Sequence, residues 1–167
     1  GSGGLETAGA EGRGLLDEYY TPKPVVDLVW KVLVENGVDT SRIQNILEPS
    51  VGIGSFLADR KLEDKTTAYE INETSAKIAR VLYPGATVIN EPFETKFIDG
   101  RGNAKDFDED FDLVVGNPPY GEHRGKYKGL GEKPNLKKYE EYFLTRALDV
   151  AKDGGVFVLQ MVYGKNM

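Results

Sequence analysis

Apolar residues occur along the chain in short runs of two kinds, and their order predicts the fold. Short runs that are apolar throughout are typical of strands buried on both faces of a parallel sheet. Stretches in which apolar residues recur every three or four positions are typical of helices with one buried face. We expect strands at residues 43–47, 67–69, 87–89, 111–115 and 156–161, and helices at residues 22–36, 56–60, 73–82 and 138–151.

This alternation of strand and helix predicts a doubly wound, mostly parallel α/β sheet. The first helix has prolines at its start and is expected to end at Gly37. The polar segments 99–110 and 121–138 are expected to be surface loops. Residues 1–14 are rich in glycine and read as a flexible leader or tag remnant, which leaves residues 15–167 as one domain.

Composition narrows the chemistry. The 167 residues include no cysteine and a single histidine, so we expect no metal site built on thiolates or imidazoles. No apolar stretch approaches the roughly 18 residues of a membrane span, which favours a cytoplasmic protein without a membrane partner. The formal charge is −6, and a nucleic-acid binder usually has a basic excess, so any affinity for DNA must come from a local patch.

The one strongly basic stretch is the expected loop at residues 121–138. Its candidate phosphate contacts are Arg124, Lys126 and Lys128, and three further lysines follow against only two glutamates. Such a loop could bind the phosphates of a nucleic acid. The alternative is an ordinary solvated loop.

A glycine-containing turn follows the first expected strand, where ligands bind in such folds. Its candidate binding residues are Glu48, Pro49, Ser50, Gly52 and Gly54. The turn is not a full dinucleotide fingerprint, and the Glu48 carboxylate would repel a pyrophosphate. A cationic or zwitterionic ligand such as S-adenosylmethionine fits better. A tight turn between strand and helix, without any ligand, is the alternative.

Two more acidic positions follow the next strands. Glu70, with Ile71 after it, ends the second strand, about where a ribose-binding acid lies in nucleotide-binding folds. After the third strand come Glu91 and Phe93, and the aromatic ring could hold an adenine. Packing of Phe93 in the core is an equally good reading.

The most specific motif is Asn117-Pro118-Pro119-Tyr120 at the end of the fourth strand. An aromatic amine is a poor nucleophile, so its methylation needs acceptors for both amino hydrogens. The Asn117 side-chain oxygen and the Pro118 carbonyl are two such acceptors. The Tyr120 ring could stack on a base rotated out of a duplex. A proline turn after a core strand is the alternative.

With these motifs in this order, residues 19–163 resemble the DNA adenine methyltransferases of restriction-modification systems and mobile elements. Tyr20, Thr21 and Pro22 match the opening motif that contacts the methionine part of the cofactor in that family. The resemblance implies a Rossmann-like S-adenosylmethionine-dependent methyltransferase fold of bacterial or phage origin. It also implies that S-adenosylmethionine is the cofactor, that a flipped adenine in DNA is the substrate, and that residues 117–120 are catalytic, with Asn117 also at the cofactor.

The chain departs from the family in two places. Pro92 takes the position of an acidic residue before the adenine-contacting Phe, which leaves Glu91 as a shifted substitute. The sequence also stops at Met167, before the last strands of the family fold, so we expect an incomplete catalytic domain that needs a C-terminal target-recognition segment or a partner subunit. The motif alone also fits a methyltransferase for protein glutamine or RNA bases. A non-catalytic cofactor-binding module of a larger restriction-modification or helicase-like protein is a further alternative.

Overall fold

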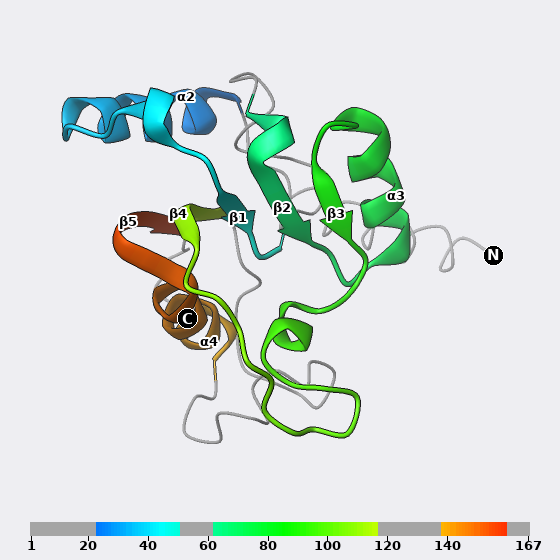
Figure 1. The fold of residues 1–167 in the computed structure, drawn as a ribbon. Helices are drawn as coiled ribbons and strands as arrows, with labels where there is room; N and C mark the ends of the chain where they lie inside the picture. Colours follow the sequence, from blue (N-terminus) through cyan, green and yellow to red (C-terminus); the bar gives the residue numbers. More distant parts are fainter. Residues whose placement is uncertain (1–22, 51–61, 117–137, 160–167) are drawn as a thin grey trace.

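A parallel β-sheet lies at the centre of the molecule (Figure 1). The computed structural model describes residues 23–50, 62–116 and 138–159. Within them the strand order is β3-β2-β1-β4-β5, and every neighbouring pair is parallel. The expected doubly wound parallel sheet is therefore confirmed. The strands are β1 (Ile46–Glu48), β2 (Thr66–Tyr69), β3 (Thr87–Ile89), β4 (Phe111–Gly116) and β5 (Ala151–Leu159).

Three helices flank the sheet in the described residues: α2 (Lys23–Glu35), α3 (Glu73–Leu82) and α4 (Tyr139–Val150). Helix α2 ends as expected, because Gly37 adopts a positive φ of 87°. The amides of Gly37 and Val38 then bond to the carbonyls of Val34 and Leu33, which satisfies the end of the helix. Short 3-10 turns lie at η1 (Thr40–Arg42), η3 (Glu63–Lys65) and η4 (Phe93–Lys96).

The helices cover both faces of the sheet, as the alternation of side chains along the strands requires. On one face Trp30 of α2 packs in a cluster with Ile46 and Leu113. Ala76 of α3 packs with Ala68, which the register of β1 and β2 places on the same face as Ile46. Helix α4 covers the opposite face (Figure 1).

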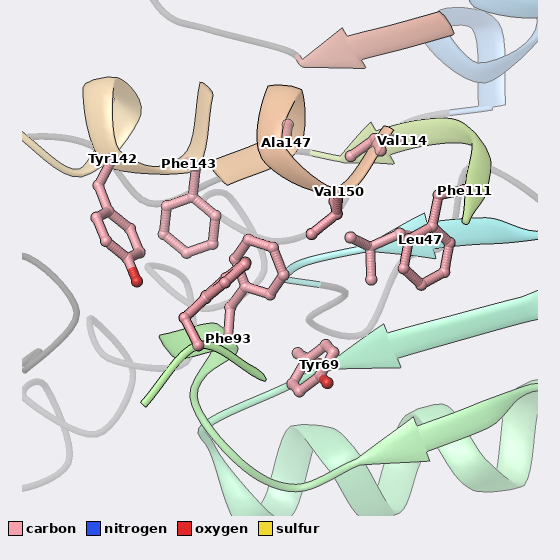
Figure 2. Packing of buried hydrophobic residues seen from close by; sticks show 10 residues of the cluster. Leu47, Tyr69, Phe93, Phe111, Val114, Tyr142, Phe143, Ala147 and Val150 are labelled. Carbon is pink, nitrogen blue, oxygen red and sulfur yellow. The ribbon is translucent and has the colours of Figure 1, made fainter. Parts of the chain in front are cut away.

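The core under α4 is aromatic (Figure 2). It joins residues of α4 to residues of three strands and of the segment after β3, and most of its side chains are fully buried. Its members are Leu47, Tyr69, Phe93, Phe97, Phe111, Val114, Tyr142, Phe143, Ala147 and Val150.

Helix α3 and strand β3 have the expected ends, and other expected elements have shifted ends. Strand β1 begins at Ile46, because Ile43 caps η1 and is buried against α2 instead of joining the sheet. Strand β5 begins at Ala151, directly after α4, and not at residue 156. The expected leader, the helix at 56–60 and most of the basic loop lie outside the described residues. No helix in the described ranges is long and apolar enough to cross a membrane.

Asp112 ties three strands together at the amino end of the sheet. Its carboxylate accepts hydrogen bonds from the amides of Gln44 and Asn45, at 2.8 and 2.9 Å, and from the Lys152 ammonium. Burial alone would raise the pKa of Asp112, but the hydrogen bonds from Lys152 and the two amides lower it below the ordinary value. Asp112 thereby links the chain entering β1 to β4 and β5.

Candidate functional site

The carboxyl ends of the strands bring the expected site residues to one edge of the sheet. Glu48 ends β1, Glu70 follows β2, and Gly116 ends β4 immediately before Asn117. The sheet is wound from β1 outward in both directions, so the strand order reverses between β1 and β4. In open α/β sheets the ligand crevice lies at this reversal, outside the carboxyl ends.

Two of the expected acids are almost fully buried at this edge, with Glu48 1% and Glu70 2% exposed. One oxygen of the Glu70 carboxylate accepts a hydrogen bond of 3.1 Å from the amide of Asn72. Asn72 in turn caps α3, with its side-chain oxygen 2.9 Å from the Ser75 amide. Glu70 is thus held in place by the turn that opens α3.

Asn90 fixes the backbone that carries Glu70. Its side-chain amide donates hydrogen bonds of 2.8 Å to the Glu70 carbonyl and 3.3 Å to the Ile71 carbonyl. The Glu70 amide also bonds to the Ile89 carbonyl at 2.9 Å. Ile71 is half exposed beside this tether. The ends of β2 and β3 therefore form one rigid support for an acid and an exposed apolar side chain.

Strand β4 passes unusually close to the turn after β1. A Cβ placed on Gly116 would lie 3.3 Å from Cδ of the Pro49 ring, and Pro49 itself is buried. Glycine permits this approach because it has no side chain. Gly116, the last described residue before Asn117, therefore lies against Pro49, and the partly exposed Ser50 follows Pro49 in the chain.

A hollow of about 870 Å³ opens next to this edge. Its walls include Ile71, Glu91 and Pro92, together with residues 98–102. This size is in the range of small-molecule sites. Two expected cofactor residues, Ile71 and Glu91, therefore line the same hollow.

Glu91 is placed by its neighbours. The hydroxyl of Thr95 lies 3.1 Å from a Glu91 carboxylate oxygen and 2.9 Å from the Pro92 carbonyl. Burial, and then the negative charge of Glu91, raises the pKa of the Tyr69 phenol above its ordinary value. The Glu91 carboxylate therefore lies at the hollow with the Thr95 hydroxyl as its hydrogen-bond partner.

Phe93 lies in the core beneath the hollow and is 1% exposed. Its ring stacks on Phe143, with centroids 5.8 Å apart, and meets the edges of Tyr69 and Phe97. Core packing accounts for its position. The expected contact of this ring with an adenine stays a prediction.

The remaining expected site residues lie outside the described residues, so their places are predictions. They are Tyr20, Thr21, Pro22, Gly52, Gly54, Asn117, Pro118, Pro119, Tyr120, Arg124, Lys126 and Lys128.

Sequence reasoning missed two parts of this edge. Asn90 directly follows an apolar strand, and a polar amide at that point is a signal of the kind that identified Asn117. The segment 99–110 was expected to be only a surface loop, yet it supplies a wall of the hollow. Its turn is built by Asp99, whose carboxylate accepts hydrogen bonds from the amides of Arg101 and Asn103. These backbone bonds, first that from Asn103, hold the pKa of Asp99 below its ordinary value.

Comparison with known proteins gives concordant results. Residues 34–163 match the model of the Eco57I restriction-modification methylase family. The chain is 34% identical over 160 residues to Defense against restriction protein B of Escherichia phage P1, covering 92% of this chain and 7% of that protein. It is 34% identical over 105 residues to Type II methyltransferase M.CvrRI of Paramecium bursaria Chlorella virus XZ-6E, covering 61% of this chain and 24% of that protein.

Solved structures share the fold. A Listeria monocytogenes protein assigned to the class I S-adenosylmethionine-dependent methyltransferases superimposes with a TM-score of 0.62 at 14% identity, over 87% of this chain and 50% of that one. A component of a type I restriction-modification system gives 0.59 at 22% identity, over 83% of this chain and 30% of that one. The Rossmann-like methyltransferase fold expected from the sequence is confirmed.

Proposed function

The chain belongs to the Eco57I restriction-modification methylase family, and on that premise we propose that it is the catalytic part of a DNA methyltransferase that uses S-adenosylmethionine to methylate the exocyclic amino group of adenine. The observation that carries this proposal is the carboxyl edge of the sheet. Buried Glu48 and Glu70, the hollow beside Ile71, and the strand that leads into Asn117 meet there.

The described residues fit the chemistry of S-adenosylmethionine. Glu48 and Glu70 give the edge the negative charge that attracts a sulfonium and an ammonium. The Glu70 carboxylate, held by the Asn72 amide, is suited to accept hydrogen bonds from ribose hydroxyls. In the hollow, Ile71 offers an apolar surface for adenine, and the Glu91 carboxylate offers an acceptor for its amino group. Phe93 supports this wall from below.

The reacting end is assigned to the segment after β4. When bound, S-adenosylmethionine supplies an electrophilic methyl group on a positively charged sulfur. The Asn117 side-chain oxygen and the Pro118 carbonyl accept the two amino hydrogens of the target base, which frees the nitrogen lone pair from the ring. Tyr120 stacks on a base that has left the duplex, and Pro119 keeps the loop rigid. Arg124, Lys126 and Lys128 bind nearby phosphates of the DNA partner.

Mass spectrometry of nucleosides tests this proposal. DNA is incubated with the natural full-length protein and S-adenosylmethionine carrying a labelled methyl group, then digested and analysed. We expect label in N6-methyl-2′-deoxyadenosine only. Label in N4-methyl-2′-deoxycytidine would contradict the assigned substrate, as would label in RNA or in a protein glutamine when either replaces DNA in the same assay. Cofactor binding by calorimetry without any methylation would support a non-catalytic module instead.

A further inference from the structure

One wall of the hollow is formed by a segment outside the β-sheet, between β3 and β4. We call residues 93–107 the pocket wall. Ile98 and Ala104 form an antiparallel bridge, and the Lys105 amide bonds to the Phe97 carbonyl at 2.8 Å. The Lys105 ammonium also donates a 2.8 Å hydrogen bond to the Thr95 carbonyl. Because these bonds close the pocket wall on itself, its shape depends little on the rest of the molecule.

The position of the pocket wall depends instead on aromatic contacts with α4. Figure 2 shows Phe143 of α4 facing Phe93, where the pocket wall begins. Phe97 meets Phe93 edge to face at 5.1 Å and Phe107 edge to face at 4.9 Å. The rings of Phe93, Phe97 and Phe107 therefore form a continuous series of ring contacts. Phe93 connects this series to Phe143 of α4.

Arg146 of α4 also contacts these rings. The guanidinium of Arg146 lies 4.0 Å from the centre of the Phe97 ring and 5.9 Å from that of Phe107. Arg146 is 9% exposed and pairs with Asp149 at 2.9 Å, within the same helix. A cation over a ring is held more strongly when both are removed from water. Arg146 thus lies over two rings of the pocket wall at once.

We propose that Arg146 is a positioning residue of the cofactor pocket, which acts through Phe97 and Phe107 to hold the pocket wall at its distance from Ile71. This inference rests on the proposed function, because it assigns the hollow to the adenosine part of S-adenosylmethionine. Ile71, whose carbonyl accepts a hydrogen bond from Asn90, lines the hollow together with residues of the pocket wall. Without the guanidinium, the pocket wall shifts and the cofactor binds less well, while the groups that act on the target base are unchanged.

The test compares Arg146→Met, which keeps a long apolar chain, with Arg146→Lys, which keeps the charge. Kd for S-adenosylmethionine is measured by calorimetry, and KM and kcat by methyl transfer to DNA with the natural full-length protein. For Arg146→Met we expect Kd and KM to rise about 3- to 10-fold, with kcat within about twofold of the wild type. Arg146→Lys should recover part of the loss.

Two controls separate positioning from stability. Asp149→Asn removes the ion pair but leaves the guanidinium on Phe97, so its Kd should stay close to that of the wild type. Arg80→Met removes a tether of α3 to the Val88 carbonyl, bonded at 2.9 and 3.2 Å, on the other face of the sheet. It should lower the melting temperature without changing Kd.

An unchanged Kd in folded Arg146→Met would overturn the inference. An equal rise in Kd for Arg80→Met and Arg146→Met would do the same, because it would show a general loss of stability. If Arg146→Met does not fold, Arg146→Lys and Asp149→Asn decide the question by the same comparison. A wild-type protein that binds no S-adenosylmethionine would contradict the proposed function itself, which is a different result.

Discussion

The two ends of the sheet hold carboxylates in different surroundings. At the amino end, Asp112 accepts hydrogen bonds from two amides and the Lys152 ammonium, and all of them join strands to one another. At the carboxyl end, Glu70 is more deeply buried, yet its bonds run to the turn of α3 beside an open hollow. The first arrangement links structural elements. The second arrangement holds Glu70 at the edge of the sheet where we propose that the cofactor binds.

For the proposed function, the surroundings of the two acids matter more than the extent of their burial. The informative feature is what surrounds the carboxylate: strand partners at Asp112, and the exposed Ile71 with a hollow at Glu70. If the comparison is correct, substitutions at the two ends should separate stability from activity.

The largest effect is expected for Asn117→Ala in the natural full-length protein. Loss of one acceptor aimed at the reacting group should lower the rate of methyl transfer by about 100- to 1,000-fold. Kd for S-adenosylmethionine and the unfolding midpoint should stay near wild type. Labelled-methyl incorporation, calorimetry and denaturant titration measure the three quantities. Normal methylation by this variant would contradict the catalytic role proposed for the carboxyl end of the sheet.

The next effect is expected for Glu70→Gln. Glutamine keeps the shape and can still accept the Asn72 bond, but it loses the charge that strengthens hydrogen bonds to the ribose. Kd for S-adenosylmethionine should rise about 10- to 100-fold, which corresponds to about 1.5–3 kcal/mol. Calorimetry on Asp112→Asn provides the matched control, where Kd should not change. Equal loss of affinity in both variants would mean that the two ends do not differ in function.

For Asp112→Asn we expect a loss of stability without a loss of cofactor affinity. Loss of the charged acceptor should lower the free energy of unfolding by about 1–3 kcal/mol at neutral pH. Because the folded pKa of Asp112 lies below its ordinary value of 3.8, its stabilisation is complete well above that pH and is lost as the pH falls through the folded pKa. Urea titrations from pH 7 to about pH 3 should therefore show the variant and wild type converging. A gap independent of pH would argue against this assignment.

The smallest effect on methyl transfer is expected for a pair of glycines. Gly116→Ala should slow methyl transfer severalfold, because the new Cβ would press on the Pro49 ring from 3.3 Å and displace the start of the Asn117 segment. Gly155→Ala, at the other end of the sheet, would set a Cβ 2.8 Å from the Lys152 carbonyl oxygen. It should cost about 1–3 kcal/mol of stability without changing Kd. Methylation kinetics and thermal unfolding of both variants would show whether Gly116→Ala changes mainly activity and Gly155→Ala mainly stability.

Local signals in the sequence were enough for much of the fold. Helix α3 was predicted with its observed ends, because its apolar spacing is regular and Asn72 caps it. Strand β5 was predicted five residues short at its start, since Lys152 to Gly155 carry no apolar signal. Those residues join the sheet through an irregular register, with Phe111 opposite Ala151 and Leu113 opposite Val156, which only the neighbouring strand imposes.

The candidate site, like the fold, could be predicted only in part from the sequence. Glu48, Glu70 and Glu91 were predicted from the sequence as cofactor-binding residues because each follows an apolar strand, and strand ends meet at one edge; their roles stay predictions. Arg146 was not found, since a charged residue on a helix normally faces water, and only the folded chain places it on Phe97. The wall of the hollow at residues 98–102 was missed for a related reason. A polar turn gives no sign in the sequence of what it stands beside.

The turn at Asp99 to Gly102 also makes the protein convenient to observe. The chain has no cysteine, so a cysteine introduced in place of Arg101 would be the single thiol available for labelling. Arg101 is exposed, lies on the rim of the hollow and sits in a turn that Asp99 holds through backbone amides. An environment-sensitive dye there would report on filling of the hollow in real time by fluorescence, without a radioactive methyl group or a DNA substrate.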